Sequence, residues 1–539
     1  MNDPLWNKQW YLNDVRAIPS MNIQKAWAKG FTGKGVVIGI VDGGVDVTHP
    51  DLSNKVKRSL SYDFIENDND PSPAYRESHG TKCAGIVVAA RNNRNCIVGA
   101  SFGSTFANLR ISDNFGSTPV TESRALVHKY DEIHIYSNSW GVIEGLGFEQ
   151  QPPVVENAIS AAVQKGRNGL GSIFLWASGN GGTNDNCNCD GYAKSINVIS
   201  IASVSENQYA GYYSEYCSAI LASCYSGDDV QYDILTTDIG GSCTNFSGTS
   251  ASTPLSAAVI ALVLEANPNL TYRDIQHLIV STSKQHSLQG RTWKRNGGGY
   301  MYNDLFGFGL LDANALTDKA ITWKLVPFQH KCVSDIMTVE RSSNVSVTSF
   351  ITSNNCNDTH IFHEVNFLEH VEIEVSFSAT KHGAVELDLT SPSGTTSHML
   401  TLRQRDVHRG AKTWRFMSVH FWGENPTGQW TLKMATPVYS QSGSLHKWNL
   451  ILYGTKYNPA FGRQPDDEQI PKESTKSITT KEEDNFCDSE NATTCGLVIG
   501  GSILGVVSLA SGVIIAFKKM KKRNSTEDSN NAINGEFPN

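Results

Sequence analysis

Three short segments, far apart in the chain, each place a reactive side chain where a predicted strand ends or a predicted helix begins. Residues 36–41 read Val-Val-Ile-Gly-Ile-Val, an apolar run typical of a buried strand, and Asp42 follows it directly. His79 opens the predicted helical segment His-Gly-Thr-Lys-Cys-Ala-Gly, and Ser250 lies at another predicted helix start, within Gly-Thr-Ser-Ala-Ser-Thr-Pro. Strands that alternate with helices predict a mainly parallel sheet with helices on both faces.

A carboxylate, an imidazole and a hydroxyl are together the groups of a nucleophilic triad. A serine hydroxyl is a weak nucleophile, so it needs a histidine base, which a carboxylate holds in the correct tautomer. Each residue alone has a plain structural explanation as a turn or cap residue. The chain order Asp42, His79, Ser250 is that of subtilisin. Asn180, in Trp-Ala-Ser-Gly-Asn-Gly after the predicted strand 172–177, is the predicted oxyanion donor, with an Asn-Gly turn as the alternative.

The two largest segments of the chain differ in their periodicity. Residues 1–325 alternate apolar strands with helical patterns, which predicts the α/β domain described above. Residues 326–455 instead contain runs of period two, such as 371–375 and 385–389, and turns such as Ser-Pro-Ser-Gly. This pattern predicts an all-β sandwich or jelly roll.

The C-terminal part is predicted to anchor the chain in a membrane. Residues 456–495 are polar and typical of a stalk. Residues 496–517 form an uncharged apolar run that would span roughly 33 Å as a helix, enough to cross a bilayer. The alternative is a buried core helix. A basic cluster opens residues 518–539, which predicts a cytoplasmic tail. The N-terminus lacks the apolar run of a secretory signal, so we expect the chain to be truncated at its start.

Charge and cysteine content narrow the functional class. The formal net charge of −8 argues against a nucleic-acid binder. Eleven cysteines indicate an oxidising compartment, and the odd number leaves at least one without a partner in the chain. N-glycosylation sequons also support secretion. They begin at Asn245, Asn269, Asn344, Asn357 and Asn491.

Four motifs together resemble the kexin/furin-type proprotein convertases. They are residues 79–85, 134–141 (His-Ile-Tyr-Ser-Asn-Ser-Trp-Gly), 187–192 (Cys-Asn-Cys-Asp-Gly-Tyr) and 248–254. The all-β segment resembles the P domain of that family, including its closing Leu-Ile-Leu-Tyr-Gly at 450–454.

The resemblance implies a calcium-dependent serine endopeptidase that cleaves secretory precursor proteins after basic residues. It would be a single-pass type I protein of the Golgi, trans-Golgi network or cell surface, with a lumenal catalytic domain. It would also be partnered by an inhibitory prodomain, which this chain lacks. The alternatives are a broad-specificity subtilisin and an inactive binder of basic peptides.

The resemblance also implies three sites for Ca²⁺, all built from oxygen ligands that suit a hard cation. The first would use Asp3, Asp51 and Asn93, with backbone carbonyls of residues 90–97. The second would use Glu144, Asp185 and Glu215, where the family has Asp in place of Glu144. The third would use Asp63, Asp68 and Asp70, for which a solvated acidic loop is the alternative.

Substrate specificity is likewise implied by acidic side chains. Asp190, with Glu144 nearby, would pair with Arg at P1, the substrate residue before the scissile bond, and Glu122 and Glu149 would meet Arg at P4. The family has Asp where this chain has Gly43, so one carboxylate of the P2 subsite is missing. Glu77 is the candidate that compensates for it, and we expect P2 selection to be relaxed.

The family also implies the pairing of the cysteines. The implied disulfides are Cys96–Cys243, Cys187–Cys217 and Cys332–Cys356. Cys83 and Cys189 would stay free, and Cys83 is expected to be a packed helix residue and not a thiol nucleophile. Cys224, Cys487 and Cys495 are left unassigned.

Overall fold

A computed structural model describes residues 1–13, 19–113, 116–228, 233–290, 292–343, 345–356 and 364–464. The predicted stalk, membrane span and cytoplasmic tail lie outside the described residues, apart from the first residues of the stalk, 456–464. The sequons at Asn344, Asn357 and Asn491 also lie outside them.

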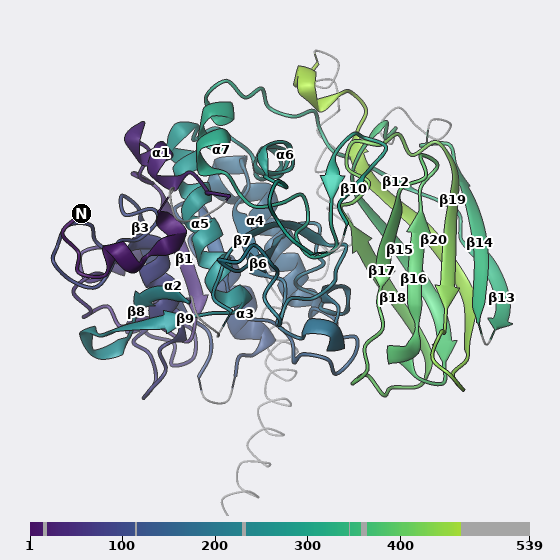
Figure 1. The fold of residues 1–539 in the computed structure, drawn as a ribbon, viewed down its shortest axis with the longest axis horizontal. Coiled ribbons are helices and arrows are strands. Elements are labelled where there is room, and N and C mark those ends of the chain that lie inside the picture. The colour runs from purple at the N-terminus through teal and green to yellow at the C-terminus, as the bar shows by residue number, and fades with distance from the viewer. Residues whose placement is uncertain are drawn as a thin grey trace, which may run out of the picture. The chain divides into compact units, whose positions relative to one another are not determined.

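The N-terminal domain is built on a seven-stranded sheet with the order β2-β3-β1-β4-β5-β6-β7, in which the described pairs are parallel. The strands are β1 (Val37–Asp42), β2 (Tyr62–Asp63), β3 (Thr105–Arg110), β4 (Ile135–Asn138), β5 (Ile173–Ala177), β6 (Ile199–Val204) and β7 (Ile220–Tyr225). All residues of β1 are buried, as its apolar run predicts. We call this part of the chain the α/β domain (Figure 1).

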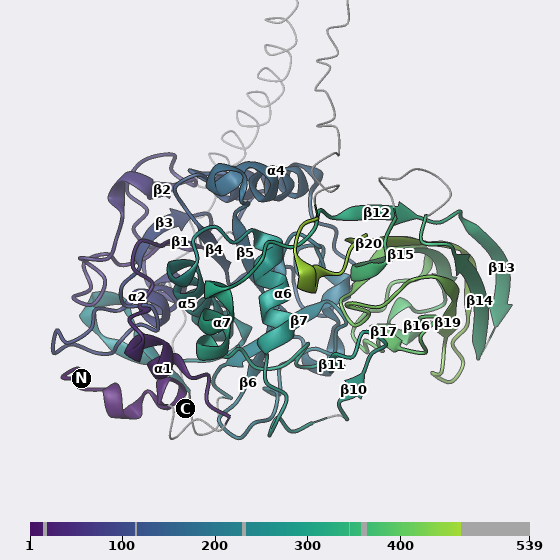
Figure 2. The ribbon, with the colours of Figure 1, turned by 90° about the horizontal axis from the view of Figure 1, so that it is seen from above.

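Helices cover both faces of this sheet. They are α1 (Ile23–Ala28), α2 (His79–Val88), α3 (Pro119–Leu126), α4 (Pro153–Gly169), α5 (Thr249–Ala266), α6 (Tyr272–Thr282) and α7 (Ala313–Ile321). Ile38 and Ile40 of β1 pack in one core with α2 and α5, whereas Val37 and Val41 pack in another with α3 and α4. Figure 2 shows α4 on one side of the sheet and α2, α5 and α7 on the other. The predicted α/β architecture is confirmed.

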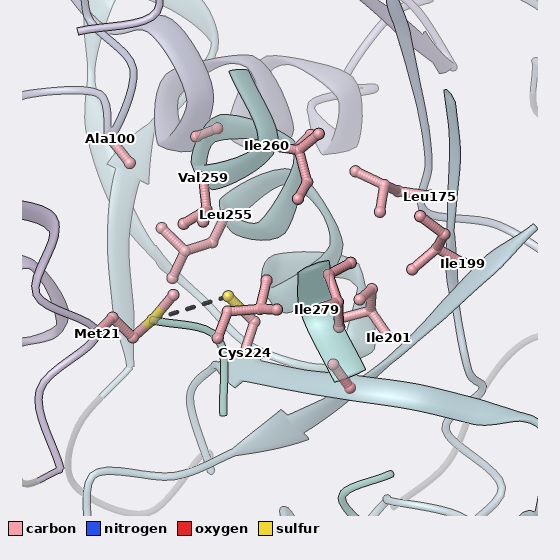
Figure 3. Packing of buried hydrophobic residues seen from close by; sticks show 14 of the residues in the cluster. Met21, Ala100, Leu175, Ile199, Ile201, Cys224, Leu255, Val259, Ile260 and Ile279 are labelled. Carbon is pink, nitrogen blue, oxygen red and sulfur yellow. Dashed lines mark hydrogen bonds between the residues drawn. The ribbon is translucent and has the colours of Figure 1, made fainter. Parts of the chain in front are cut away.

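The helix α5 is the centre of the larger core. Most of its residues are buried, and Leu255, Val259 and Ile260 share one core with Ile279 of α6 and Cys224 of β7 (Figure 3). The Cys224 thiol lies 3.8 Å from the sulfur of Met21, and burial raises its pKa strongly, so this cysteine is a packing residue. Within the described part of the chain, α5 is the one helix long and apolar enough to cross a membrane. Its burial identifies it as a core helix.

The second domain consists of two antiparallel sheets, and we call it the β domain. One sheet has the order β12-β20-β15-β18, with β13 also paired to β20, and the other has the order β14-β19-β16-β17. The strands are β12 (His330–Val333), β13 (Met337–Ser343), β14 (Ser346–Ser353), β15 (Phe367–Ala379), β16 (Glu386–Thr390), β17 (Thr396–Leu400), β18 (Gly410–Ser418), β19 (Gly428–Ala435) and β20 (Gly443–Thr455). Ile373 and Leu450 of the first sheet share one core with Leu387 and Leu432 of the second, so the all-β prediction is confirmed.

Smaller elements complete the fold. Two two-stranded sheets pair β8 (Ile234–Thr237) with β9 (Cys243–Phe246) and β10 (Lys294–Arg295) with β11 (Met301–Tyr302). Disulfides join Cys96 to Cys243, Cys187 to Cys217 and Cys332 to Cys356, with Cα–Cα distances of 5.8, 5.5 and 5.7 Å. These are the three pairs that the resemblance implies.

A buried ion pair joins the two domains. Glu369 of β15 accepts hydrogen bonds from Arg273 of α6 (3.1 Å from Nε), from His277 (2.7 Å) and from Gln329 (2.6 Å). Burial raises the pKa of Glu369, but Arg273 and His277 outweigh it and hold this pKa well below its usual value. The carboxylate is therefore ionised at neutral pH and neutralises a buried guanidinium.

Candidate active site

Asp42 and His79 form a hydrogen-bonded pair at the carboxyl edge of the parallel sheet. Asp42 is the last residue of β1, and His79 is the first of α2. Nδ1 of His79 lies 2.8 Å from Oδ2 and 3.0 Å from Oδ1 of Asp42, and the backbone N–H of Gly43 donates to Oδ1 at 2.7 Å. Because a carboxylate only accepts hydrogen bonds, Nδ1 carries a proton, and Nε2 is the nitrogen that can act as a base.

Three side chains shape the environment of His79: Asp42, Phe246 and Cys83. Burial lowers its pKa, but the carboxylate of Asp42 outweighs it, so the pKa stands well above the usual value. The ring of Phe246 meets the imidazole edge-on at 5.2 Å. The thiol of Cys83 lies 3.8 Å from Asp42 Oδ2, and burial raises its pKa. An uncharged buried thiol is a poor nucleophile, which agrees with the predicted packing role of Cys83.

Ser250 is the second residue of α5. Gly248, with φ of 79°, lets the chain turn into this helix. The hydroxyl of Ser250 donates to the carbonyl of Ser139 at 3.3 Å, and the hydroxyl of Ser139 donates to the carbonyl of Ser250 at 3.1 Å. The hydroxyl of Ser250 is thus turned toward Ser139. Catalytic hydrogen bonds are often formed only in the substrate complex.

Asn180 follows β5 and is exposed at the same edge of the sheet. Its Oδ1 accepts hydrogen bonds from the backbone N–H of Thr249 at 2.9 Å and from the Thr249 hydroxyl at 3.0 Å. These two bonds fix the orientation of the amide and leave Nδ2 as the group that can donate to a ligand. This orientation agrees with the predicted role of Asn180 as an oxyanion donor, which stays a prediction.

A cavity of about 50 Å³ opens beside Ser250 and Asn180, and Asp190 contributes to its lining. Burial raises the pKa of Asp190 to about 7, although the backbone N–H groups of Tyr192 (2.6 Å) and Ala193 (3.3 Å) oppose the shift. A buried carboxyl group with a raised pKa is costly to ionise without a partner. A cation bound next to it would therefore stabilise its ionised form strongly. Gly141 leaves this carboxylate accessible, since a Cβ there would lie 2.9 Å from Asp190 Oδ2.

Glu144, Asp185 and Glu215 form an acidic cluster behind Asn180. Their carboxylate oxygens lie within 4.8 Å of one another, and Asp185 and Glu215 are buried. Glu144 accepts the N–H of Asn180 at 2.8 Å, and Glu215 accepts the N–H of Gly181 at 2.9 Å. Burial, followed by the neighbouring carboxylates, raises the pKa of Glu215, and burial raises that of Asp185 to about 6. Mutual repulsion and an oxygen-only donor set fit a hard cation.

The structure also brings Asp3, Asp51 and Asn93 together. The backbone N–H groups of Asn92 and Asn93 donate to Asp3 at 2.9 and 3.0 Å. Asp51 accepts from the Asn93 side chain at 2.6 Å and from the N–H of Ile97 at 3.2 Å. Both carboxylates are buried, so this group also offers oxygen ligands for a cation.

The third acidic group has a different arrangement. Asp63 is buried and forms an ion pair with Arg110, so its charge is already neutralised. Asp68 and Asp70 are exposed, and each accepts a hydrogen bond from a backbone N–H two residues further along the chain. This geometry favours the solvated acidic loop over a cation site.

The remaining specificity acids lie in different environments. Glu122 is buried, and its oxygens accept hydrogen bonds from Ser117 (2.5 Å) and Tyr192 (2.7 Å). Glu149 is exposed, and only its backbone pairs with the loop of Asp190.

The side chain of Glu77 packs against Gly43, next to Asp42 and His79. Its carboxylate accepts the backbone N–H of His79 at 2.8 Å. A Cβ on Gly43 would lie only 2.8 Å from Glu77 Cγ, so the Glu77 side chain fills the space that a larger residue at position 43 would need.

Comparisons with known proteins agree with this site. Residues 33–309 match the model of the subtilase family, Peptidase_S8, and residues 368–452 match the model of the proprotein convertase P-domain. This chain belongs to the subtilase family, in its proprotein convertase branch.

Several curated relatives of this subtilase are more than 40% identical to it. Human neuroendocrine convertase 2 is 41% identical over 504 residues, which cover 90% of this chain and 79% of the relative. Neuroendocrine convertase 2 of Caenorhabditis elegans is 41% identical over 501 residues, covering 85% and 76%. Proprotein convertase subtilisin/kexin type 5 of Rattus norvegicus is 42% identical over 480 residues. The alignment covers 85% of this chain but only 26% of that longer relative.

A solved structure of lower identity shares the fold of this subtilase. The serine protease of Aeromonas sobria has a TM-score of 0.73 and 20% identity, with 84% of this chain and 96% of that chain covered. At this identity the likeness concerns the fold alone.

Two contacts in the site of this subtilase were not predicted from its sequence. Thr249 orients the Asn180 amide, and Phe246 packs on His79. Both lie within four residues of Ser250, so their place in the motif was a signal. Their roles depend on contacts with distant segments, which a single sequence does not reveal.

Proposed function

We propose that the chain is a calcium-dependent serine endopeptidase that cleaves secretory precursor proteins after Arg, with basic residues upstream and relaxed P2 selection. The observation that carries this proposal is the carboxylate of Asp190 in the cavity beside Ser250. A guanidinium that enters this cavity would find a counter-charge there, and the peptide bond after it would lie near the nucleophile.

The triad would work by acyl transfer. His79 Nε2 takes the proton of Ser250 as its oxygen attacks the carbonyl carbon, and Asp42 stabilises the resulting imidazolium. Asn180 Nδ2 and the backbone N–H of Ser250 donate to the oxyanion. His79 then gives its proton to the leaving amine, which leaves an acyl-enzyme on Ser250. Water attacks this ester with His79 again as the base, and the acid product leaves.

The upstream subsites would be set by the other acidic residues. Glu144 lies near Asp190 and would add to the field around P1 Arg. Glu122 and Glu149 are the candidates for Arg at P4. Glu77 is the carboxylate nearest to Gly43, and because it already accepts the N–H of His79, it would be a weaker partner for a basic P2 than a free carboxylate.

Replacing Asp190 by Asn should abolish the preference for Arg at P1. Desolvating the guanidinium without a counter-charge is costly, so we expect kcat/KM for P1 Arg substrates to fall by about 100-fold, chiefly through KM. The value for a matched P1 norleucine substrate should stay within a few-fold. Cleavage of a peptide series that differs only at P1 measures both. Equal losses for both substrates would contradict the assignment of Asp190.

Two other functions lead to different results in the same assay. A broad-specificity subtilisin would cleave without a requirement for P1 Arg and would be indifferent to chelation. An inactive binder of basic peptides would bind the series without cleaving it, although Asp42, His79, Ser250 and Asn180 are all present.

The acidic cluster and the group around Asp3 would hold the calcium. The cluster offers Glu144, Asp185 and Glu215, and the other site offers Asp3, Asp51 and Asn93, whereas Asp63 is engaged by Arg110. A bound cation would relieve the repulsion between the carboxylates of the cluster and fix the loops that carry them.

Removal of Ca²⁺ should inactivate the enzyme and lower its unfolding temperature. A chelator leaves the buried carboxylates of the cluster uncompensated, so we expect a loss of activity that added Ca²⁺ restores. Glu215→Gln should raise the Ca²⁺ concentration needed for half-maximal activity, while the exposed control Asp68→Asn should not. Activity that is insensitive to chelation, or an equal effect of both variants, would contradict this site assignment.

We further propose that the protein works in the Golgi, in the trans-Golgi network or at the cell surface, anchored by residues 496–517 with its catalytic domain in the lumen. The three disulfides and the exposed sequons Asn245 and Asn269 support an oxidising compartment. Its partners would be precursors with basic cleavage sites and an inhibitory prodomain. Retention in the membrane pellet after alkaline extraction tests the anchor.

A further inference from the structure

The loops that carry the acidic residues of the site all contact the same strand of the β domain. β18 is an outer strand of its sheet, so one of its edges lacks a neighbouring strand. Backbone groups on a buried edge must find other partners, because an unpaired buried N–H or C=O is costly. Three loops of the α/β domain supply contacts to β18.

The first contact is made by Asn188, whose side chain is fully buried. Its Oδ1 accepts the N–H of Met417 at 2.8 Å, and its Nδ2 lies 3.0 Å from the carbonyl of the same residue. The Met399 carbonyl (3.1 Å) and the Ser218 hydroxyl (2.8 Å) also lie within hydrogen-bond distance of Nδ2, so three acceptors share its two hydrogens. The Asn188 carbonyl accepts from Trp414 Nε1 at 2.7 Å. One carboxamide thus pairs with both backbone groups of a β18 residue, as a neighbouring strand would do.

The second contact comes from the loop of Glu215. Ser218, three residues further on, donates from its hydroxyl to the Met417 carbonyl at 2.8 Å, and its own carbonyl accepts the N–H of Val419 at 3.0 Å. The disulfide Cys187–Cys217 joins this loop to the loop of Asn188, one residue away from each contact.

The third contact comes from the loop of Glu144. Phe148, four residues further on, places its ring 5.2 Å from that of Trp414 and 5.9 Å from that of Phe416, both on β18. The guanidinium of Arg403 lies 4.8 Å from the Phe148 ring centroid. The loops of all three cluster acids are therefore anchored on one strand.

We propose that β18 sets the position of the acidic side chains, and that Asn188 is the positioning residue through which the β domain places Asp190. The Asp190 carboxylate is held by N–H groups of its own loop, those of Tyr192 and Ala193. Its position therefore follows that of the loop, which Asn188 fixes from two residues away. The assay rests on the proposed function, since it uses Arg as the ligand of Asp190.

The test is the full chain with Asn188→Ala, compared with wild type on substrates that differ only at P1. We expect the ratio of kcat/KM for Arg over norleucine to fall by about tenfold, through KM for the Arg substrate, with kcat nearly unchanged. The rate at which a small sulfonyl fluoride modifies Ser250 should stay at the wild-type value, because the triad is untouched. Amide hydrogen exchange in residues 185–192 should accelerate while β15 and β20 remain protected.

The matched control is Ile351→Ala, which removes a buried side chain from β14 in the other sheet. It lowers stability from a strand that pairs with β19, in the sheet that does not contain β18, so the P1 ratio should stay at the wild-type value. If Asn188→Ala fails to fold, Phe148→Leu tests the same anchoring through the third loop, and the same fall in the P1 ratio is expected.

Three outcomes distinguish a failure of the proposed function from a failure of the positioning role of Asn188. A wild-type enzyme without preference for P1 Arg contradicts the proposed function, and the exchange rate of residues 185–192 then decides the role of Asn188 alone. An unchanged P1 ratio and unchanged exchange in a folded Asn188→Ala overturn the positioning role. An equal fall in the ratio for Ile351→Ala also overturns it, because the effect would then follow general stability.

Discussion

Replacing Ser250 by alanine is expected to lower kcat by about 10⁶-fold while leaving KM nearly unchanged, as the loss of the nucleophile does in subtilisin. The physical reason is that the hydroxyl is the group that forms the acyl-enzyme, and the neighbouring thiol of Cys83 cannot replace it. That thiol is buried, and burial raises its pKa, so it stays protonated. Single-turnover cleavage of a P1 Arg peptide measures the loss.

The matched control for this variant is Ser252→Ala. Ser252 lies on the same helix and is buried, but its hydroxyl donates to the carbonyl of Thr249 at 3.0 Å and has no place in the triad. We expect it to keep kcat within a few-fold of wild type. A Ser250→Ala enzyme that still cleaves above background, or an equal loss for Ser252→Ala, would contradict the triad.

Replacing Glu369 by glutamine is expected to destabilise the protein by about 3–5 kcal/mol, the usual cost of leaving a buried charge without its partner. Arg273 would then be buried at the junction of the two domains without a counter-charge, and His277 and Gln329 would lose a charged acceptor. Because the pKa of Glu369 is held below its usual value of 4.5, its contribution is present above about pH 4.5. That contribution is lost as the pH falls below this value.

Thermal unfolding followed by tryptophan fluorescence, at neutral and acidic pH, measures this effect. The matched control is Glu374→Gln, the same change on the same strand, in an ion pair with Arg415 at 3.1 Å that is partly exposed to solvent. An exposed pair of this kind contributes about 0–1 kcal/mol. Comparable shifts for both variants would show that Glu369 does not stabilise the junction as described.

The fold was predictable because both domains have clear periodicities. The apolar strand before Asp42 and the period-two runs of the β domain specify buried parallel strands and half-buried antiparallel strands, and both are present. A span at 496–517 was also predicted, but it lies outside the described residues. Within those residues the helix α5 has comparable apolar character, and only packing identifies it as a core element.

The sequence was sufficient to name candidate residues of the site, but it did not show which distant residues each of them contacts. Asp42 and His79 were identified by their motifs, and the structure pairs them. The three acidic groups looked alike in the sequence, because an acidic loop does not reveal which arginine will approach it. Arg110 neutralises Asp63 from another strand, whereas Glu215 has carboxylates as neighbours. The same limit applies to Asn188, since its partners in the β domain, Met399 and Met417, lie more than 200 residues away in the sequence.

The contact between Gly43 and Glu77 links the evolution of these two positions. An aspartate at position 43 would force the Glu77 side chain to move, since the new Cβ would lie 2.8 Å from Glu77 Cγ. A glutamate at 77 also caps the N–H of His79, so shortening it first would give up a hydrogen bond beside the base. Either single step is therefore unfavourable alone. We therefore expect the two positions to change in a coupled way, so that relatives that differ at one position differ at the other more often than at unlinked positions.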